Sequence, residues 1–255
     1  MSHTNTVLGR RFVVALLALL SVCAPALAGP PLSIDDPGIL DAGHWEIIGA
    51  TTLTSGSDGD YRQGPLLDIS LGVIEDYMQI GFVYPYANAS PDSGGSPSDF
   101  GNAEIGVKWR FLNSDRLQMA FAPYHVFGVS SSKAEKGIGD ANDATVMPVN
   151  AKYSIDDQWS LNGEVSYVSA DNDENAWGYG VAVAFAANDG LNLMVEVAGE
   201  SDTDFDEDFL ELRAGFDATL SDSFHLLFSI ATGIREPSGA ADLDYDVFLG
   251  LQYFR

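Results

Sequence analysis

Most of the chain alternates polar and apolar residues with a period of two, in runs of roughly ten residues. The run over residues 102–111 shows this best, because polar and charged positions alternate there with Ala, Ile, Val, Trp and Phe. Successive side chains of a strand point to opposite sides, so the pattern predicts one polar and one apolar face. It predicts further strands at 67–73, 159–167, 177–186, 191–198, 210–217, 224–234 and 244–253, and less regular ones at about 43–54, 77–87, 116–127 and 144–155.

The lengths of the connections distinguish two architectures. A soluble sandwich of two sheets would show the same alternation, with its apolar faces in a shared core. Short turns such as Glu75-Asp76 and Asp156-Asp157 alternate here with longer connections at about 55–63, 88–100, 128–142, 169–175, 200–208 and 235–243. Short periplasmic turns and long outer loops are typical of outer-membrane barrels. We therefore predict an all-β fold, a transmembrane up-and-down antiparallel β-barrel of about 12 strands.

Aromatic residues gather near both ends of the predicted strands. Trp109 and Trp159 fall at short-turn ends, whereas Tyr84 and Trp177 fall at long-loop ends. Two girdles of aromatic residues mark the two interfaces of a membrane. General enrichment of aromatic residues in strands is the alternative explanation.

The N-terminus predicts export from the cytoplasm. Arg10 and Arg11 precede an apolar run over residues 12–24, and residues 26–28 form a small-x-small cleavage site. This order of features is that of a secretory signal peptide, which we place at residues 1–28.

Two other interpretations of the N-terminus are open. A transmembrane helix is disfavoured because the apolar run is short and contains Pro25. A lipoprotein cleaved before Cys23, the only cysteine, is disfavoured by the bulky Val22. With cleavage after residue 28, the mature chain has no thiol chemistry. We divide it into a periplasmic N-terminal segment at 29–42 and an outer-membrane barrel at 43–255.

The charge of the chain is strongly negative. The formal net charge is −25, and it becomes −27 once residues 1–28 are removed, because they contain two arginines and no acid. Nucleic acid is excluded as a partner, since phosphate binding needs Lys and Arg. The densest acidic run, residues 200–208, lacks the ligand spacing of a calcium-binding hand. We interpret it as a solvated loop, with bridging of lipopolysaccharide through divalent cations as the alternative.

Several short motifs resemble those of the bacterial outer-membrane transporters named for the MetA pathway of phenol degradation. They are Pro-Leu-Ser-Ile-Asp-Asp-Pro-Gly at 31–38, Gly-His-Trp-Glu-Ile at 43–47, the strand at 101–111 and the closing run at 249–253. The resemblance implies a barrel that passes small, aromatic molecules. Ile34 replaces the usual Thr, and Arg255 occupies the place of the outward aromatic that usually ends such barrels. The implied partners are outer-membrane lipid and lipopolysaccharide, the barrel assembly machinery and a small-molecule solute.

Charged residues on the polar faces are the candidates for lining the lumen. They are Asp68, Glu104, Lys108, Arg110, Lys152, Glu164, Glu196, Glu211, Arg213, Asp217 and Arg235. Such residues could form a structural ion-pair network that fills a narrow lumen. The alternative is a charged constriction that selects solutes.

We do not expect an enzyme. After removal of the signal, only His44, His125 and His225 remain as histidines, and no nucleophile motif, phosphate loop or metal-ligand spacing accompanies them. No cofactor is expected. The sequence favours a channel or uptake barrel for passive passage of small solutes. The alternative is a structural or surface-interaction barrel with a plugged lumen and acidic outer loops.

Overall fold

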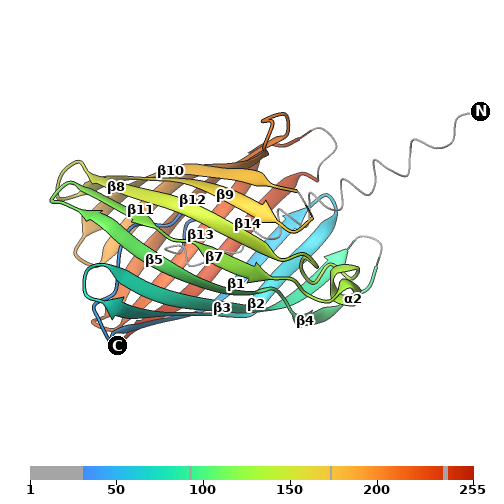
Figure 1. The fold of residues 1–255 in the computed structure, drawn as a ribbon, viewed down its shortest axis with the longest axis horizontal. Helices are drawn as coiled ribbons and strands as arrows, with labels where there is room; N and C mark the ends of the chain where they lie inside the picture. Colours follow the sequence, from blue (N-terminus) through green and yellow to red (C-terminus); the bar gives the residue numbers. More distant parts are fainter. Residues whose placement is uncertain (1–30, 92–93, 173, 238–240) are drawn as a thin grey trace, which may run out of the picture.

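The chain forms a closed antiparallel β-barrel (Figure 1), which confirms the predicted transmembrane fold class. The structure, a computed structural model, describes residues 31–91, 94–172, 174–237 and 241–255. In those residues the strands are β1 (Trp45–Gly56), β2 (Gly59–Ile74), β3 (Met78–Pro91), β4 (Ser98–Phe100), β5 (Ala103–Asn113), β6 (Leu117–Phe121), β7 (Tyr124–Phe127), β8 (Ala144–Ser154), β9 (Trp159–Ala170), β10 (Ala176–Asn188), β11 (Leu191–Asp202), β12 (Asp208–Ser221), β13 (Phe224–Arg235) and β14 (Leu243–Phe254), with one short helix, α2 (Ser131–Ala134).

These strands occupy 12 positions around the ring. Each barrel strand pairs with its neighbours in the sequence, and β14 returns to pair with β1. β4 pairs only with the outer part of β3, so it extends a hairpin without taking a position in the ring. β6 and β7 share one position, because both pair with β5 on one side and with β8 on the other.

Pro123 divides the strand predicted at 116–127 into β6 and β7. Proline has no backbone N–H to donate to a sheet. Backbone bonds still continue past the break, because Pro123 accepts one from Val107 at 3.0 Å and Pro148 accepts one from Ala122 at 3.1 Å. The barrel wall therefore stays joined at this point.

The two faces of each strand meet different surroundings, as the alternation predicted. On β5, Ile105 and Trp109 are exposed on the outside, whereas Glu104 and Lys108 are buried on the inside. The same outward exposure of large apolar side chains recurs on β2, β9, β10, β11 and β14. An apolar outer band with a polar interior is the arrangement of a barrel that crosses a membrane.

The two ends of the barrel differ. In Figure 1 the C-terminus lies at one end, and α2 and β4 lie at the other. Trp45 and Arg255 close the ring at the short-turn end by two backbone hydrogen bonds of 2.7 and 2.9 Å. The aromatic pair Tyr167–Trp177, with ring centroids 5.0 Å apart, lies at the other end.

One predicted long connection, at 55–63, is wrong. β1 ends at Gly56 and β2 begins at Gly59, so only two residues join them. Residues 59–63, which we predicted as part of this connection, pair with β1 and β3, and a register shift follows next to Pro65. Gly64 permits that shift, because a Cβ there would lie 2.4 Å from the Thr51 hydroxyl oxygen. Short and long connections therefore do not alternate throughout.

None of the helices in the described residues has the length and apolar character needed to span a bilayer.

Candidate solute pathway and its plug segment

Residues 31–44, which precede β1, enter the barrel and are called the plug segment below. Leu32 and Ile34 are buried and pack on Ala182 and Ala198, two inward positions of β10 and β11. Gly180 leaves the space that Ile34 fills, since a Cβ there would lie 2.4 Å from the isoleucine. We expected residues 29–42 to lie outside the barrel in the periplasm, but residues 31–40 are buried or half-buried against inward side chains of the barrel. The polar contacts of the plug segment explain why.

Two carboxylates of the lumen hold the inner end of the plug segment. Glu196 accepts hydrogen bonds from the backbone N–H groups of Ser33 and Ile34, at 2.9 and 3.0 Å. The Ser33 hydroxyl donates a hydrogen bond to Glu211. An extended segment without strand partners must find such acceptors, because buried N–H groups without partners are costly.

Two lysines hold the middle of the plug segment. The Lys108 ammonium lies 2.6 Å from Asp35 and also donates to the Asp36 carbonyl oxygen at 3.0 Å. Lys152 lies 3.5 Å from the Asp36 carboxylate. The Lys108–Asp35 pair is enclosed, with exposed side-chain fractions of 6% and 4%. Glu164 completes this region by accepting the backbone N–H of Asp35 at 2.9 Å.

Backbone contacts hold the end of the plug segment near β1. Gln79 accepts the N–H of Leu40 at 3.0 Å, and Gly43 donates to the Gly72 carbonyl oxygen at 2.9 Å. Gly72 allows this close approach, because a Cβ there would lie 2.1 Å from the Asp41 carbonyl oxygen. The plug segment thus contacts the lumen wall over residues 31–40, and residues 41–44 are exposed at the short-turn end.

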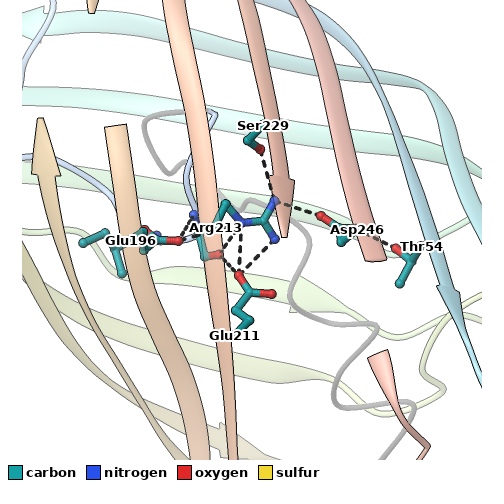
Figure 2. A network of polar contacts seen from close by, with 8 residues as sticks. Thr54, Glu196, Glu211, Arg213, Ser229 and Asp246 are labelled. Atoms are coloured by element: carbon teal, nitrogen blue, oxygen red, sulfur yellow. Dashed lines mark hydrogen bonds and ion pairs between the residues drawn. The ribbon is translucent and has the colours of Figure 1, made fainter. Parts of the chain in front are cut away.

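Arg213 is the centre of a polar network next to the plug segment (Figure 2). Its guanidinium lies 3.0 Å from Glu211 and 2.8 Å from Asp246, and it donates to Ser229 at 3.2 Å. Glu196 is a more distant partner at 3.8 Å. One arginine therefore joins β11, β12, β13 and β14 to the segment that occupies the lumen.

The other candidate residues lie at different depths. Arg110 pairs with the turn residue Asp76 at 2.9 Å, and Asp217 contacts His225 at 2.8 Å. Arg235 lies apart from the buried network, since its side chain is 62% exposed and pairs with Asp208 at the long-loop end.

Asp68 and Glu104 are buried inside the barrel, and their Oδ1 and Oε2 atoms accept no hydrogen bond from a described residue.

The part of the lumen formed by β1, β2, β3, β13 and β14 carries an apolar patch. Its buried members are packed together, and the Tyr124 ring from β7 packs against them; the members are Ile48, Ala50, Leu66, Val83, Leu227 and Phe248. The lumen wall therefore combines this apolar patch with charged residues, which lie on β5, β9, β11 and β12 and also on β2 and β14, as Asp68 and Asp246 show. These inward apolar residues interrupt the predicted polar faces of their strands. Periodicity alone did not show that they would pack together into one patch.

Sequence reasoning missed the residues of the plug segment itself. Ser33, Asp35 and Asp36 supply most of the polar contacts described for the plug segment, although they precede the first strand. The available signal was the acidic pair Asp35-Asp36, which Pro37 and Gly38 follow. Acidic residues of a segment next to the barrel can pair with its inward lysines.

The neighbourhood of His125 does not resemble a catalytic pair. Its ring contacts the Thr145 hydroxyl at 3.1 Å and lies 3.6 Å from Asp143. Among the described residues, no serine hydroxyl hydrogen-bonds to it, and Ser130 contacts Ser132 instead. A search of the same residues finds no group of three or more His, Cys, Asp or Glu side chains that could hold a metal ion.

Comparison with known proteins identifies the fold. No family model and no curated protein matches the sequence. The structure is similar to the COG4313 outer membrane channel from Pseudomonas putida F1, with a TM-score of 0.73 and 10% identity, covering 86% of this chain and 98% of that one. It is also similar to the NanC porin (TM-score 0.60, 10% identity, coverage 82% and 98%) and to the KdgM porin in complex with disordered oligogalacturonate (0.56, 9%, 82% and 98%). The chain thus has the fold of outer-membrane channel barrels.

Proposed function

We propose that the protein is an outer-membrane channel through which small solutes pass passively. The observation that carries this proposal is the lumen: a closed barrel with an apolar exterior has a charged interior wall, and that wall holds a non-strand segment of the same chain. Hydrogen bonds and ion pairs hold the plug segment, not a covalent link or a strand ladder. Such contacts can exchange with water and solute, so the lumen can conduct.

The lumen suits small amphipathic solutes. Its charged part would hold water and polar groups, and the apolar patch would take a ring or an alkyl body. The resemblance to phenol-degradation transporters makes phenols and related aromatic molecules the first solutes to test. Because fold likeness does not give function, this choice rests on the lumen and on the resemblance.

Liposome swelling tests the proposal. Liposomes containing the refolded barrel are diluted into isosmotic solutions of phenol, benzyl alcohol, glucose and a disaccharide. We expect swelling with the small aromatic solutes and none with the disaccharide. Swelling with none of them, from a barrel shown to be folded by its heat-modifiable migration on gels, contradicts a channel.

A second candidate function is a structural or surface-interaction barrel with a permanently closed lumen. It is favoured by the same plug segment, whose anchors extend from Glu196 to Gly72. In that case the acidic residues at 200–208 would act on the outside, and removal of the plug segment would change no transport property. Contact with lipid and lipopolysaccharide and insertion by the barrel assembly machinery belong to both proposals. The signal peptide at 1–28 lies outside the described residues.

A further inference from the structure

Two carboxylates of the lumen form no ion pair with a described residue. Asp68 on β2 is 4% exposed and Glu104 on β5 is 1% exposed. Asp68 Oδ1 and Glu104 Oε2 are shielded from solvent without accepting a hydrogen bond, and no ion pair joins either residue to another described residue. A buried acceptor without a donor is costly, and a charged one more so. Every other charged candidate of the lumen described above has at least one polar partner.

The register places these two carboxylates in one row of the barrel wall. Asp68 lies opposite Val83, and Val83 lies opposite Glu104, so two strand spacings of roughly 10 Å in total separate their Cα atoms. The charge of Asp68 reaches Glu104. Ile48 lies beside Asp68 on the other side, and Val126 beside Glu104, and both are buried. The two carboxylates are thus set between apolar side chains.

Lys108, the lysine whose charge acts on Asp68, is already paired with the plug segment. Lys108 is inward on β5, but Asp35 and the Asp36 carbonyl oxygen of the plug segment hold its ammonium at 2.6 and 3.0 Å. Between Lys108 and Glu104 the inward position of β5 is Gly106, which pairs with Gly81 on β3. Neither glycine adds a side chain to the lumen, so the wall contributes no cation beside the two carboxylates.

The two carboxylates and the apolar side chains beside them indicate which kind of ligand could bind there. Two carboxylates attract a cation, and two are too few for a metal site, in agreement with the absence of a metal-holding group among the described residues. An ammonium group can donate three hydrogen bonds, which suits two acceptors on either side of it. Val83 and Ile48 belong to the apolar patch, so a body attached to the ammonium would meet apolar surface.

We propose that Asp68 and Glu104 form a binding subsite for the ammonium head of a small amine whose apolar body lies on the apolar patch. The inference rests on the proposed channel function and names a solute class for it. The ammonium supplies donors to Asp68 Oδ1 and Glu104 Oε2, and the ring or chain packs against the apolar side chains of the patch. Anions of the same size are excluded by the carboxylates.

Isothermal titration calorimetry on the full mature barrel in a non-ionic detergent tests the subsite. The probes are benzylamine, benzyl alcohol and benzoate, which share a ring and differ in the charge of the head. We expect benzylamine to bind about tenfold or more tightly than benzyl alcohol, and benzoate not to bind. The double variant Asp68→Asn, Glu104→Gln should bind benzylamine no better than benzyl alcohol.

The control is Glu200→Gln, which neutralises a carboxyl group on β11, across the ring from β3. It should keep the benzylamine affinity of the wild type. If the double variant does not fold, Glu104→Gln alone should weaken benzylamine binding several-fold. Equal binding of benzylamine and benzyl alcohol by the wild type, or unchanged benzylamine binding by a folded Asp68/Glu104 variant, overturns the subsite.

Conductance of the wild type is measured in parallel. Current without amine selectivity rejects the subsite alone, and amine binding without current rejects the channel alone.

Discussion

Replacing Lys108 by methionine should loosen the plug segment and raise the conductance of the barrel. Lys108 and Asp35 form an enclosed ion pair of 2.6 Å. Removing one partner of a buried pair leaves an uncompensated charge and costs about 3–5 kcal/mol. The two nearest backbone contacts, from the Asp35 N–H to Glu164 and from the Leu40 N–H to Gln79, contribute only about 0.5–1.5 kcal/mol each in the other direction. We therefore expect the middle of the plug segment to leave its position in the lumen.

Single-channel recording measures this effect, and Arg110→Met is the matched control. Arg110 is also a buried, inward base of β5, two residues further along, but it contacts the turn residue Asp76 and not the plug segment. Lys108→Met should give larger or more frequent openings than the wild type, with faster proteolysis of residues 31–44. Arg110→Met should keep the wild-type openings, although it removes the same charge. If Lys108→Met behaves like Arg110→Met in both assays, the plug segment is not held as we describe.

Three further substitutions test other parts of the structure. In Gly72→Val, the added Cβ would lie 2.1 Å from the Asp41 carbonyl oxygen of the plug segment. The end of the plug segment near β1 should therefore become sensitive to protease, while the barrel remains folded. Val181→Arg puts a charge at the middle of the lipid-facing surface, where it should cost about 2–4 kcal/mol in unfolding from lipid, whereas Leu220→Arg near the strand end should cost about 0–1 kcal/mol. The hydrogen bond donated by Lys133, 2.9 Å from Asp99, lowers the pKa of that carboxyl, so this contact weakens as the pH falls through the lowered pKa. Lys133→Met should raise the Asp99 pKa toward its ordinary value in an NMR titration, with the Phe100 N–H still lowering it, and an unchanged value would contradict the contact.

The sequence was sufficient for the barrel and its faces. On β5 the alternation of Glu104, Lys108 and Arg110 with apolar residues carries the whole argument, because the period of a strand is fixed by its backbone geometry. The pattern was less reliable at residues 59–63, which we placed in a long connection between strands. Pairing with strands on both sides makes them part of β2 instead, and a single register shift at Gly64 accommodated the proline.

The candidate site was only partly predictable. The inward charges of the strands follow from parity, but their partners depend on residues far away in the sequence. Asp35 meets Lys108 across 73 positions, and Ser33 meets Arg213 across 180. The apolar patch likewise forms because inward residues of β1, β2, β3, β13 and β14 come together when the ring closes. Contacts of this kind depend on barrel closure and on the path of the plug segment, which period-two patterns do not contain.

The most direct test of the account is the conductance of the mature barrel in planar lipid bilayers, compared with that of a variant lacking residues 31–42. We expect small, well-defined single-channel openings from the intact barrel and distinctly larger ones from the shortened variant, because the charged lumen remains while the plug segment is gone. Both proteins are first shown to be folded by their heat-modifiable migration on gels. Absence of current from both would contradict a conducting lumen, and equal current from both would contradict a plug segment that limits it.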